Sequence, residues 1–559
     1  MTEQSARTPT VIDAIADRYV DVISELQPTL ATYIGRREHD GRFGDYSPAG
    51  VEEVAAATRS ILRDLEAATP VDDVDVVTQT DLSRELRLNL ELHESGNHLR
   101  DVNVIASPAQ DIRAAFDLMP TDTADDWSVI SDRLAALPDA VAGYVETLRA
   151  GIAAGVVPAR RQVTEVAAQI DRYTATDGFF AEFAGKAAPA AGGDLPASLS
   201  SDLTARADAS REAYDRLAAF LRDELAPVAS EEDGVGRERY ALHSASFLGA
   251  VIDLDETYEW GIAELARMVA EQEQIADAIL PGASVEEAVA HLEADPTMKL
   301  HGTEALQRWM QETSDRAVAE LGRTHFDIPE PVRRLECMIA PTNEGGIYYT
   351  GPTDDFSRPG RMWWSVPEGV TEFDTWRELT TVYHEGVPGH HLQIGQAVYN
   401  RAELNSWRRL LAGTSGHAEG WALYAERLME QLGYLDRPAD RLGMLDGQRM
   451  RAARVVLDIG VHLGKPRPDG DGVWDADFAL AFMRRNVNMP DEFIRFEVNR
   501  YLGWPGQAPA YKVGQRIWEQ IRDDVRAAEG DAFSMKAFHK RALDLGGVGL
   551  DTLRSALAP

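Results

Sequence analysis

The residues best suited to chemistry lie in one short stretch, residues 381–393, which reads Thr-Val-Tyr-His-Glu-Gly-Val-Pro-Gly-His-His-Leu-Gln. It places His384 next to Glu385 and adds His390 and His391, so three of the 13 histidines fall within eight residues. Imidazole nitrogens bind zinc, and a glutamate beside a ligating histidine can act as general base, as in the motif His-Glu-x-x-His. The stretch therefore predicts a zinc site with a catalytic glutamate.

The spacing departs from that motif because position 388 is proline. On a regular helix, His390 would lie on the wrong side, and His391 would lie on the right face but about 10.5 Å further along it. Two imidazoles that each approach one zinc ion to about 2.0–2.1 Å cannot span that distance. If Pro388 and Gly389 bulge out, the remainder reads His-Glu-Gly-Val-His, which ranks His390 above His391 as second ligand. The alternative is a helix that ends at a Pro-Gly turn with surface histidines.

A third ligand is expected on a second helix, residues 416–428 (Gly-His-Ala-Glu-Gly-Trp-Ala-Leu-Tyr-Ala-Glu-Arg-Leu). This segment is apolar over most of its circumference, which indicates a buried helix. Glu419 would be costly there unless it is paired or bound to a metal. We therefore assign Glu419 as third ligand, with His417 as a weaker candidate and an ion pair between Glu419 and an arginine as the alternative. Gly420 would let another backbone come close.

Three protein ligands leave zinc a fourth position for water, whose pKa zinc lowers towards about 7. Glu385 can take that proton and pass it to a leaving amine. The oxyanion that forms needs another donor, and the candidates are Tyr511, Tyr501 and His462. Tyr511 ranks first because the Pro-Gly-Gln at 505–507 can turn the chain into a cleft, although a tyrosine in a helix more often belongs to the core.

Two further groups of residues could serve this site. His462 shares a helix face with Arg454 and Asp458, which is typical of a salt-bridged stripe or of residues that orient a site. A peptidase that trims short chains also needs a cation for the terminal carboxylate. Arg358, Arg500 and Lys512 are the candidates, and their sequence context does not rank them.

The segments His-Glu-Gly-Val-Pro-Gly-His-His-Leu-Gln and His-Ala-Glu-Gly-Trp-Ala-Leu-Tyr-Ala-Glu resemble the bacterial domain-of-unknown-function family 885. Segments 346–349, 356–360, 454–462 and 500–514 also resemble it, and Tyr349 in the first of these is added to the predicted substrate-binding set. That family is grouped with zinc metallopeptidases whose third ligand is glutamate. The resemblance implies a mostly helical fold around a deep cleft, similar to helical carboxypeptidases and oligopeptidases, but no particular substrate.

The elements that must position these residues are mainly helices, recognised by apolar residues at helical spacing. We expect a mainly α, single metallopeptidase-like unit over 1–559, with a helical part (1–330) and a catalytic part (331–559). The catalytic part should hold a small antiparallel sheet (331–370; strands 334–340, 346–350 and 361–366), zinc helices (374–432) and C-terminal helices. Helices are expected near 9–35, 49–68, 76–95, 108–118, 124–135, 137–155, 160–174, 197–226, 256–279, 283–294, 302–322, 440–463, 475–485, 491–501, 508–528 and 532–545.

Composition excludes some classes of protein. A net charge of −36 argues against binding to nucleic acid or to anionic membranes. One cysteine, Cys337, allows no internal disulfide. The opening residues lack the apolar region of a secretory signal, and no run is long enough to span a membrane, so we expect a cytoplasmic protein. An oligomer is possible.

Together these patterns favour a zinc metallopeptidase that cleaves short peptides in carboxypeptidase, dipeptidase or oligopeptidase mode. The alternatives are a zinc hydrolase of a non-peptide amide or ester, and a non-catalytic zinc-binding protein. Glu385 argues against the last, because a structural zinc site needs no base.

Overall fold

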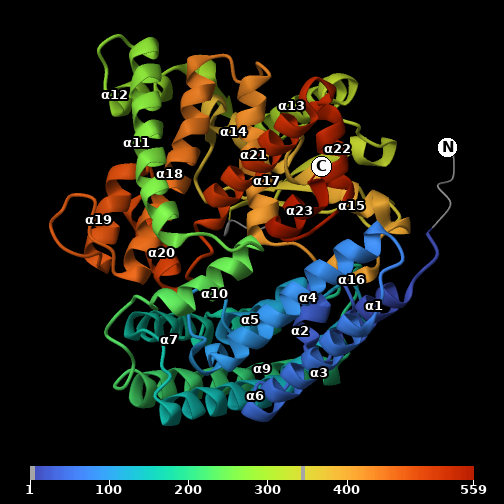
Figure 1. The fold of residues 1–559 in the computed structure, drawn as a ribbon. Helices are drawn as coiled ribbons and strands as arrows, with labels where there is room; N and C mark the ends of the chain where they lie inside the picture. The colour runs from blue at the N-terminus through green and yellow to red at the C-terminus, as the bar shows by residue number, and fades with distance from the viewer. Residues whose placement is uncertain (1–6, 341–345, 559) are drawn as a thin grey trace.

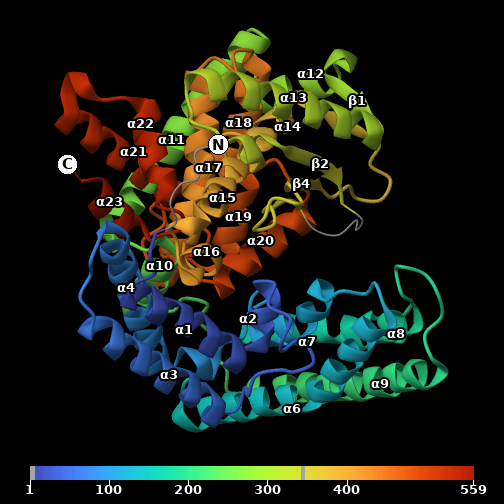
Figure 2. The ribbon, with the colours of Figure 1, turned by 90° about the vertical axis from the view of Figure 1, so that its right-hand side faces the viewer.

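The computed structural model describes residues 7–340 and 346–558. Helices dominate it and a small sheet is present, which confirms the predicted mainly α class. The ribbon has a lower part made of the N-terminal helices, drawn in blue and teal, and an upper part made of the remaining helices and the strands (Figures 1 and 2). Helix α10 (Arg237–Leu248) runs between the two parts.

Most helices lie where the sequence predicted them, but those at 179–185, 237–248 and 550–557 were not predicted, and the predicted 9–35 is divided into two helices. The lower helices are α1 (Val11–Leu26), α2 (Pro28–Tyr33), α3 (Pro48–Ala67), α4 (Asp73–Glu94), α5 (Pro108–Ala114), α6 (Ala124–Ala154), α7 (Arg160–Thr174), α8 (Phe179–Gly185) and α9 (Ala197–Phe220). The upper helices before the sheet are α11 (Leu254–Ile279), α12 (Val285–Glu293) and α13 (Thr303–Thr324). Those after it are α14 (Thr375–Glu385), α15 (His390–Tyr399), α16 (Ser406–Leu410), α17 (Ser415–Gln431), α18 (Pro438–Leu463), α19 (Ala476–Asn486), α20 (Asp491–Gly503), α21 (Ala510–Glu529), α22 (Met535–Asp544) and α23 (Leu550–Leu557).

Helix α6 is one continuous helix where the sequence predicted two, and it contains Pro138. A proline has no N–H to donate to the carbonyl four residues earlier, here that of Leu134. The hydroxyl of Ser210 on α9 lies 3.2 Å from this carbonyl, while its shorter contact, at 2.8 Å, is to the carbonyl of Arg206 on its own helix. A hydroxyl from a distant segment therefore approaches the carbonyl that Pro138 leaves without its usual N–H.

The three strands predicted at 334–340, 346–350 and 361–366 are present as β2 (Leu335–Ile339), β3 (Ile347–Thr350) and β4 (Gly360–Trp364). Their order is β2-β4-β3, with β4 antiparallel to β3 but parallel to β2. The prediction of an antiparallel sheet was therefore wrong. Strand direction depends on how the connections run, which the alternation of side chains within a strand does not record. A second pair, β1 (Lys299–His301) and β5 (Glu372–Asp374), was not predicted.

The hydrophobic core divides the chain near residue 230, whereas the sequence division was placed at 330. One large buried cluster takes its residues almost entirely from 240–557, and two smaller clusters occupy 102–229 and 12–86 with Trp407. A fourth cluster packs the three-stranded sheet against α13 and α14. Helices α10–α13 thus share one core with α14, α17 and α18.

A buried carboxylate joins α4 to the start of α23. Asp81 on α4 has no exposed surface and accepts hydrogen bonds from the backbone N–H of Gly549 at 3.0 Å and the hydroxyl of Thr552 at 2.7 Å. A buried carboxylate is stable only when such donors satisfy it. Together with Arg84 on the same helix, these donors satisfy Asp81 and tie α4 to the start of α23.

Helices α17 and α21 touch through their backbones. A Cβ atom on Gly420 of α17 would lie 2.5 Å from the carbonyl carbon of Gly514, and one on Gly514 would lie 2.3 Å from the carbonyl oxygen of Gly416. The expected role of Gly420, to admit another backbone, is confirmed. This contact brings the start of α21 beside Glu419.

Replacing Gly514 by alanine is expected to lower the free energy of unfolding by about 1–3 kcal/mol, because the new methyl group collides with backbone that cannot move alone. Gly322→Ala on α13 is the matched control, since its Cβ would meet Ile328 at an ordinary 3.5 Å. Alanine is favoured over glycine in a helix by about 1 kcal/mol, so the control should gain stability. Urea unfolding followed by circular dichroism measures both changes, and equal midpoints for the two variants would contradict the close packing.

Candidate metal centre

Three side chains from three helices meet at one point. His384 lies at the end of α14, His390 begins α15 and Glu419 lies in the first turns of α17. Their ligand atoms lie within 4.8 Å of one another. The Oε2 atom of Glu419 is 3.3 Å from Nε2 of His384 and 3.6 Å from Nε2 of His390. Two imidazoles and one carboxylate thus converge with the donor set of a zinc site.

The break between α14 and α15 makes this convergence possible. Helix α14 ends at Glu385 and α15 begins at His390, so residues 386–389 are looped out. A side chain on Gly389 would fall 1.9 Å from the carbonyl oxygen of His384, so only glycine fits there. The indole of Trp421 on α17 donates to the carbonyl of Pro388 at 2.9 Å and holds the loop. The fold thereby returns His390 to the side of His384.

The two weaker ligand candidates point elsewhere. The Nε2 atom of His391 lies 2.7 Å from the carbonyl of Val332, and its Nδ1 lies 2.9 Å from the hydroxyl of Tyr349. His417 contacts Gln393 at 3.3 Å. Neither histidine belongs to the cluster. Tyr349, predicted to bind substrate, is placed against His391.

A second carboxylate, which the sequence analysis did not assign, orients His384. Glu426 on α17 lies 2.8 Å from Nδ1 of His384, and the amide of Gln448 donates to Glu426 at 2.9 Å. A carboxylate on the far nitrogen fixes the tautomer and orientation of a ligating imidazole. Its spacing in the sequence could have indicated this role, because Glu426 follows Glu419 by seven residues and so lies two turns later on the same helix face.

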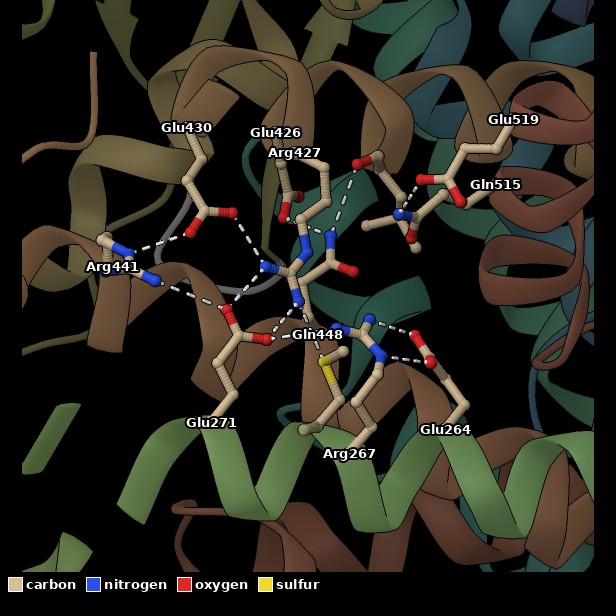
Figure 3. A network of polar contacts seen from close by, with 12 residues as sticks. Glu264, Arg267, Glu271, Glu426, Arg427, Glu430, Arg441, Gln448, Gln515 and Glu519 are labelled. Atoms are coloured by element: carbon tan, nitrogen blue, oxygen red, sulfur yellow. Dashed lines mark hydrogen bonds and ion pairs between the residues drawn. The ribbon is translucent and has the colours of Figure 1, made fainter. Parts of the chain in front are cut away.

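A larger polar network surrounds Glu426 and Gln448 and links α17 to neighbouring helices of the upper part (Figure 3). Gln448 accepts a hydrogen bond from Lys512 at 2.7 Å, and Lys512 forms an ion pair with Glu264 of α11 at 3.1 Å. Arg427 of α17 forms an ion pair at 3.1 Å with Glu271, which lies on α11 like Glu264. The orientation of His384 is therefore supported from α11, α18 and α21.

The electrostatics of the cluster fit a cation. Burial lowers the pKa of His384, but the carboxylates of Glu419 and Glu426, one beside each ring nitrogen, outweigh it and raise that pKa to about 10. Burial raises the pKa of Glu419, but the two histidines hold it well below its usual range. Among the described residues, Oε2 of Glu419 and Nδ1 of His390 are buried without a hydrogen-bond partner. A divalent ion would displace the proton of His384 and satisfy the carboxylate, so these residues fit zinc.

Glu385 lies beside the cluster without belonging to it. Only 7% of its surface is exposed, and burial raises its pKa, opposed by His390 and His384. A carboxylate with a raised pKa next to a metal site is suited to accept and return a proton.

Of the three predicted oxyanion donors, only Tyr511 lies near the cluster. It is half-buried on the first turn of α21, and burial together with the charge of Glu419 raises its pKa to about 12. Tyr501 is fully buried and hydrogen-bonds Glu497 and Arg454. His462 contacts the backbone carbonyl of Tyr501 at 3.0 Å. The structure therefore gives Tyr501 and His462 structural partners away from the cluster.

The three predicted substrate cations also have partners within the chain. Arg358 donates to the carbonyl of Gly351 at 2.8 Å. Arg500 binds Glu497 at 3.0 Å and Gln507 at 2.7 Å. Lys512 is held by the network described above.

A different cation, which the sequence analysis did not single out, faces the site. Arg451 is half-buried on α18, one turn after Gln448, and its guanidinium carbon lies 6.0 Å from the ring centre of Tyr511. Its position in the sequence could have indicated this, because Arg451 lies one turn before Arg454 on the predicted helix 440–463, and Arg454 was already considered for the site.

Comparison with solved structures shows a shared fold. A protein from Colwellia psychrerythraea, described as a "putative lipoprotein", superposes with a TM-score of 0.83 and 22% sequence identity, covering 98% of each chain. A protein from Shewanella oneidensis, described as a "putative lipoprotein of unknown function", gives a TM-score of 0.75 and 17% identity, covering 98% of this chain and 99% of that one. A carboxypeptidase from Pyrococcus furiosus aligns at a TM-score of 0.45 and 12% identity over 99% of this chain and 96% of that one, too low to support an argument.

A search of curated proteins finds no match. Within residues 7–340 and 346–558, no helix is both long and apolar enough to cross a membrane, and the cytoplasmic location stays a prediction. The family comparison covers almost the whole sequence, since residues 28–557 match the family described as "Bacterial protein of unknown function (DUF885)". The chain therefore belongs to this bacterial family, the one that its paired histidine and glutamate motifs resemble.

Proposed function

We propose that this protein is a zinc-dependent peptidase that acts on short peptides. The observation that carries the proposal is the convergence of His384, His390 and Glu419 directly beside Glu385. Zinc held there would supply a Lewis acid for the substrate carbonyl and lower the pKa of a coordinated water. A purely structural site would have no use for the adjacent glutamate.

The residues of the chain divide the remaining tasks. Glu385 would accept a proton from the attacking water and pass it to the leaving amine. Glu426, held by Gln448, keeps Nε2 of His384 directed at the cluster. Tyr511 would donate a hydrogen bond to the carbonyl oxygen as negative charge develops on it.

Replacing Tyr511 by phenylalanine is expected to lower kcat on the order of 10²–10³-fold while KM stays nearly unchanged, because the phenol's hydrogen bond strengthens only in the transition state. Steady-state kinetics of the zinc-loaded variant measure this split. The control is Tyr501→Phe, which removes a hydroxyl engaged with Glu497 and Arg454. If Tyr511→Phe kept full kcat while Tyr501→Phe lost it, the role would pass to Tyr501.

The proposed function is tested with a library of acetylated tri- and tetrapeptides, incubated with the chelated protein and with the protein after zinc is restored. New peptide fragments that require zinc, detected by mass spectrometry, are the expected result. A parallel panel of non-peptide amides and esters provides the alternative outcome. Hydrolysis of that panel alone would make the protein a zinc hydrolase of another bond, and inactivity on both would leave a zinc-binding protein.

A further inference from the structure

The cations around the centre differ in whether the chain itself satisfies them. Arg454, Arg500 and Lys512 each hold a carboxylate within the fold. The guanidinium of Arg451 forms no hydrogen bond or ion pair with any residue in 7–340 or 346–558, although its Nε atom is buried. A buried donor without a partner is unfavourable. Such a group is suited to a ligand that brings its own acceptor.

Arg451 lies on the catalytic side of α18. Its side chain folds back over Gly447, where a Cβ atom would fall 2.6 Å from Nη1, so the glycine leaves room for the guanidinium. The guanidinium is 6.0 Å from the ring centre of Tyr511. Gln448, one turn earlier on α18, donates at 2.9 Å to Glu426, the carboxylate that orients the first histidine of the cluster. Arg451 therefore lies beside the proposed oxyanion donor and one helical turn from the residue that holds Glu426.

We propose that Arg451 binds the free C-terminal carboxylate of the substrate, so that the peptidase proposed above acts as a carboxypeptidase. A guanidinium holds a carboxylate through two parallel hydrogen bonds. Because one residue of chain spans only about 3.3–3.6 Å, a carboxylate held beside Tyr511, the proposed donor to the attacked carbonyl oxygen, is assigned to the residue that leaves. This inference rests on the proposed function and narrows its substrates to peptides with an unblocked C-terminus.

The reaction is a simple hydrolysis. The oxygen of water bonds to the carbonyl carbon of the last peptide bond, and the C–N bond breaks. Glu385 carries one proton of the water to the leaving nitrogen. The products are a free amino acid, whose carboxylate remains on Arg451, and a peptide one residue shorter with a new carboxylate.

The first experiment compares two tripeptide libraries that are identical except for a free or an amidated C-terminus. Zinc-loaded wild type is expected to release the last residue of the free acids about 10- to 100-fold faster, the range for a charge-assisted pair. Arg451→Gln should lose this preference because it cleaves the free acids more slowly, while its rate on the amides stays at the wild-type value. Arg451→Lys should keep part of the preference. Arg437→Gln, an exposed position at the start of α18, is the matched control and should behave as wild type.

Equal cleavage of acids and amides by wild type, or an unchanged preference in Arg451→Gln, would overturn the carboxypeptidase inference while the peptidase proposal stands. Selective cleavage of amides that end in aspartate or glutamate would also overturn it, because Arg451 would then read a side chain.

The second experiment gives a result even if no peptide is cleaved. Zinc-loaded Glu385→Gln is mixed with both libraries in equal amounts, and the bound peptides are recovered by ultrafiltration and counted by mass spectrometry. Free acids should be enriched about tenfold or more over amides. The enrichment should vanish in the double variant that carries both Glu385→Gln and Arg451→Gln. Equal recovery of acids and amides would reject the role of Arg451 independently of catalysis.

Discussion

Replacing Glu385 by glutamine is expected to leave the zinc content intact and to lower kcat on the order of 10²–10⁴-fold. The side chain lies beside His384 and outside the three-residue cluster, so the metal should not depend on it. Glutamine keeps the size of the side chain but cannot accept a proton, and general acid–base catalysis contributes a factor of this size. Zinc analysis by mass spectrometry and turnover of a cleaved peptide measure the two quantities on one preparation.

A matched control for this variant is Glu378→Gln, a half-buried carboxylate two turns earlier on α14 whose pKa is raised by burial to about 7. It should retain both zinc and turnover. Wild-type rates in Glu385→Gln would remove the proposed base from the mechanism, and a loss of zinc in that variant would make Glu385 a ligand.

The purified protein is expected to contain about one zinc ion per chain, and His384→Ala, His390→Ala and Glu419→Ala should each lose it. Each change removes one of three protein ligands. The loss of affinity should exceed the roughly 10- to 100-fold that the loss of an outer hydrogen-bond partner costs. Metal analysis after dialysis against a weak chelator measures the retained zinc, and circular dichroism checks that the helices persist.

His391→Ala is the discriminating control, because His391 faces Tyr349 and Val332 on the other side of α15. It should keep its zinc. Undiminished zinc in His390→Ala, together with loss in His391→Ala, would move the ligand role to His391.

The parts of the fold and site that could be predicted from the sequence are those that depend on local spacing. Helix bounds follow the apolar periodicity, and the three strands of the sheet lie where alternation and turn residues place them. The preference for His390 over His391 came from the geometry of a helix with two residues looped out. The close approach of a backbone to Gly420 was likewise predictable, because glycine next to a buried charge has few other uses.

The parts that could not be predicted depend on partners far away in the sequence. Near Pro138 of α6, the hydroxyl that approaches the freed carbonyl comes from Ser210 of α9. Strand β4 lies between β2 and β3, an order that the strands themselves do not encode. Arg500 and Arg451 are both arginines in predicted helices, and only the folded structure shows that the first is bound to Glu497.

The buried carboxylate of Asp81 has a consequence for how the chain is made. Its donor at Gly549 lies 468 positions later in the sequence. At about 5–20 residues per second, a ribosome needs roughly 25–95 s to travel that far. Throughout this time Asp81 lacks two of its donors and has only Arg84, three residues later on α4, at 3.1 Å. The buried bonds from Gly549 and Thr552 can form only after α23 is synthesised, whereas the apolar face of α4 can pack on α1 and α3 long before.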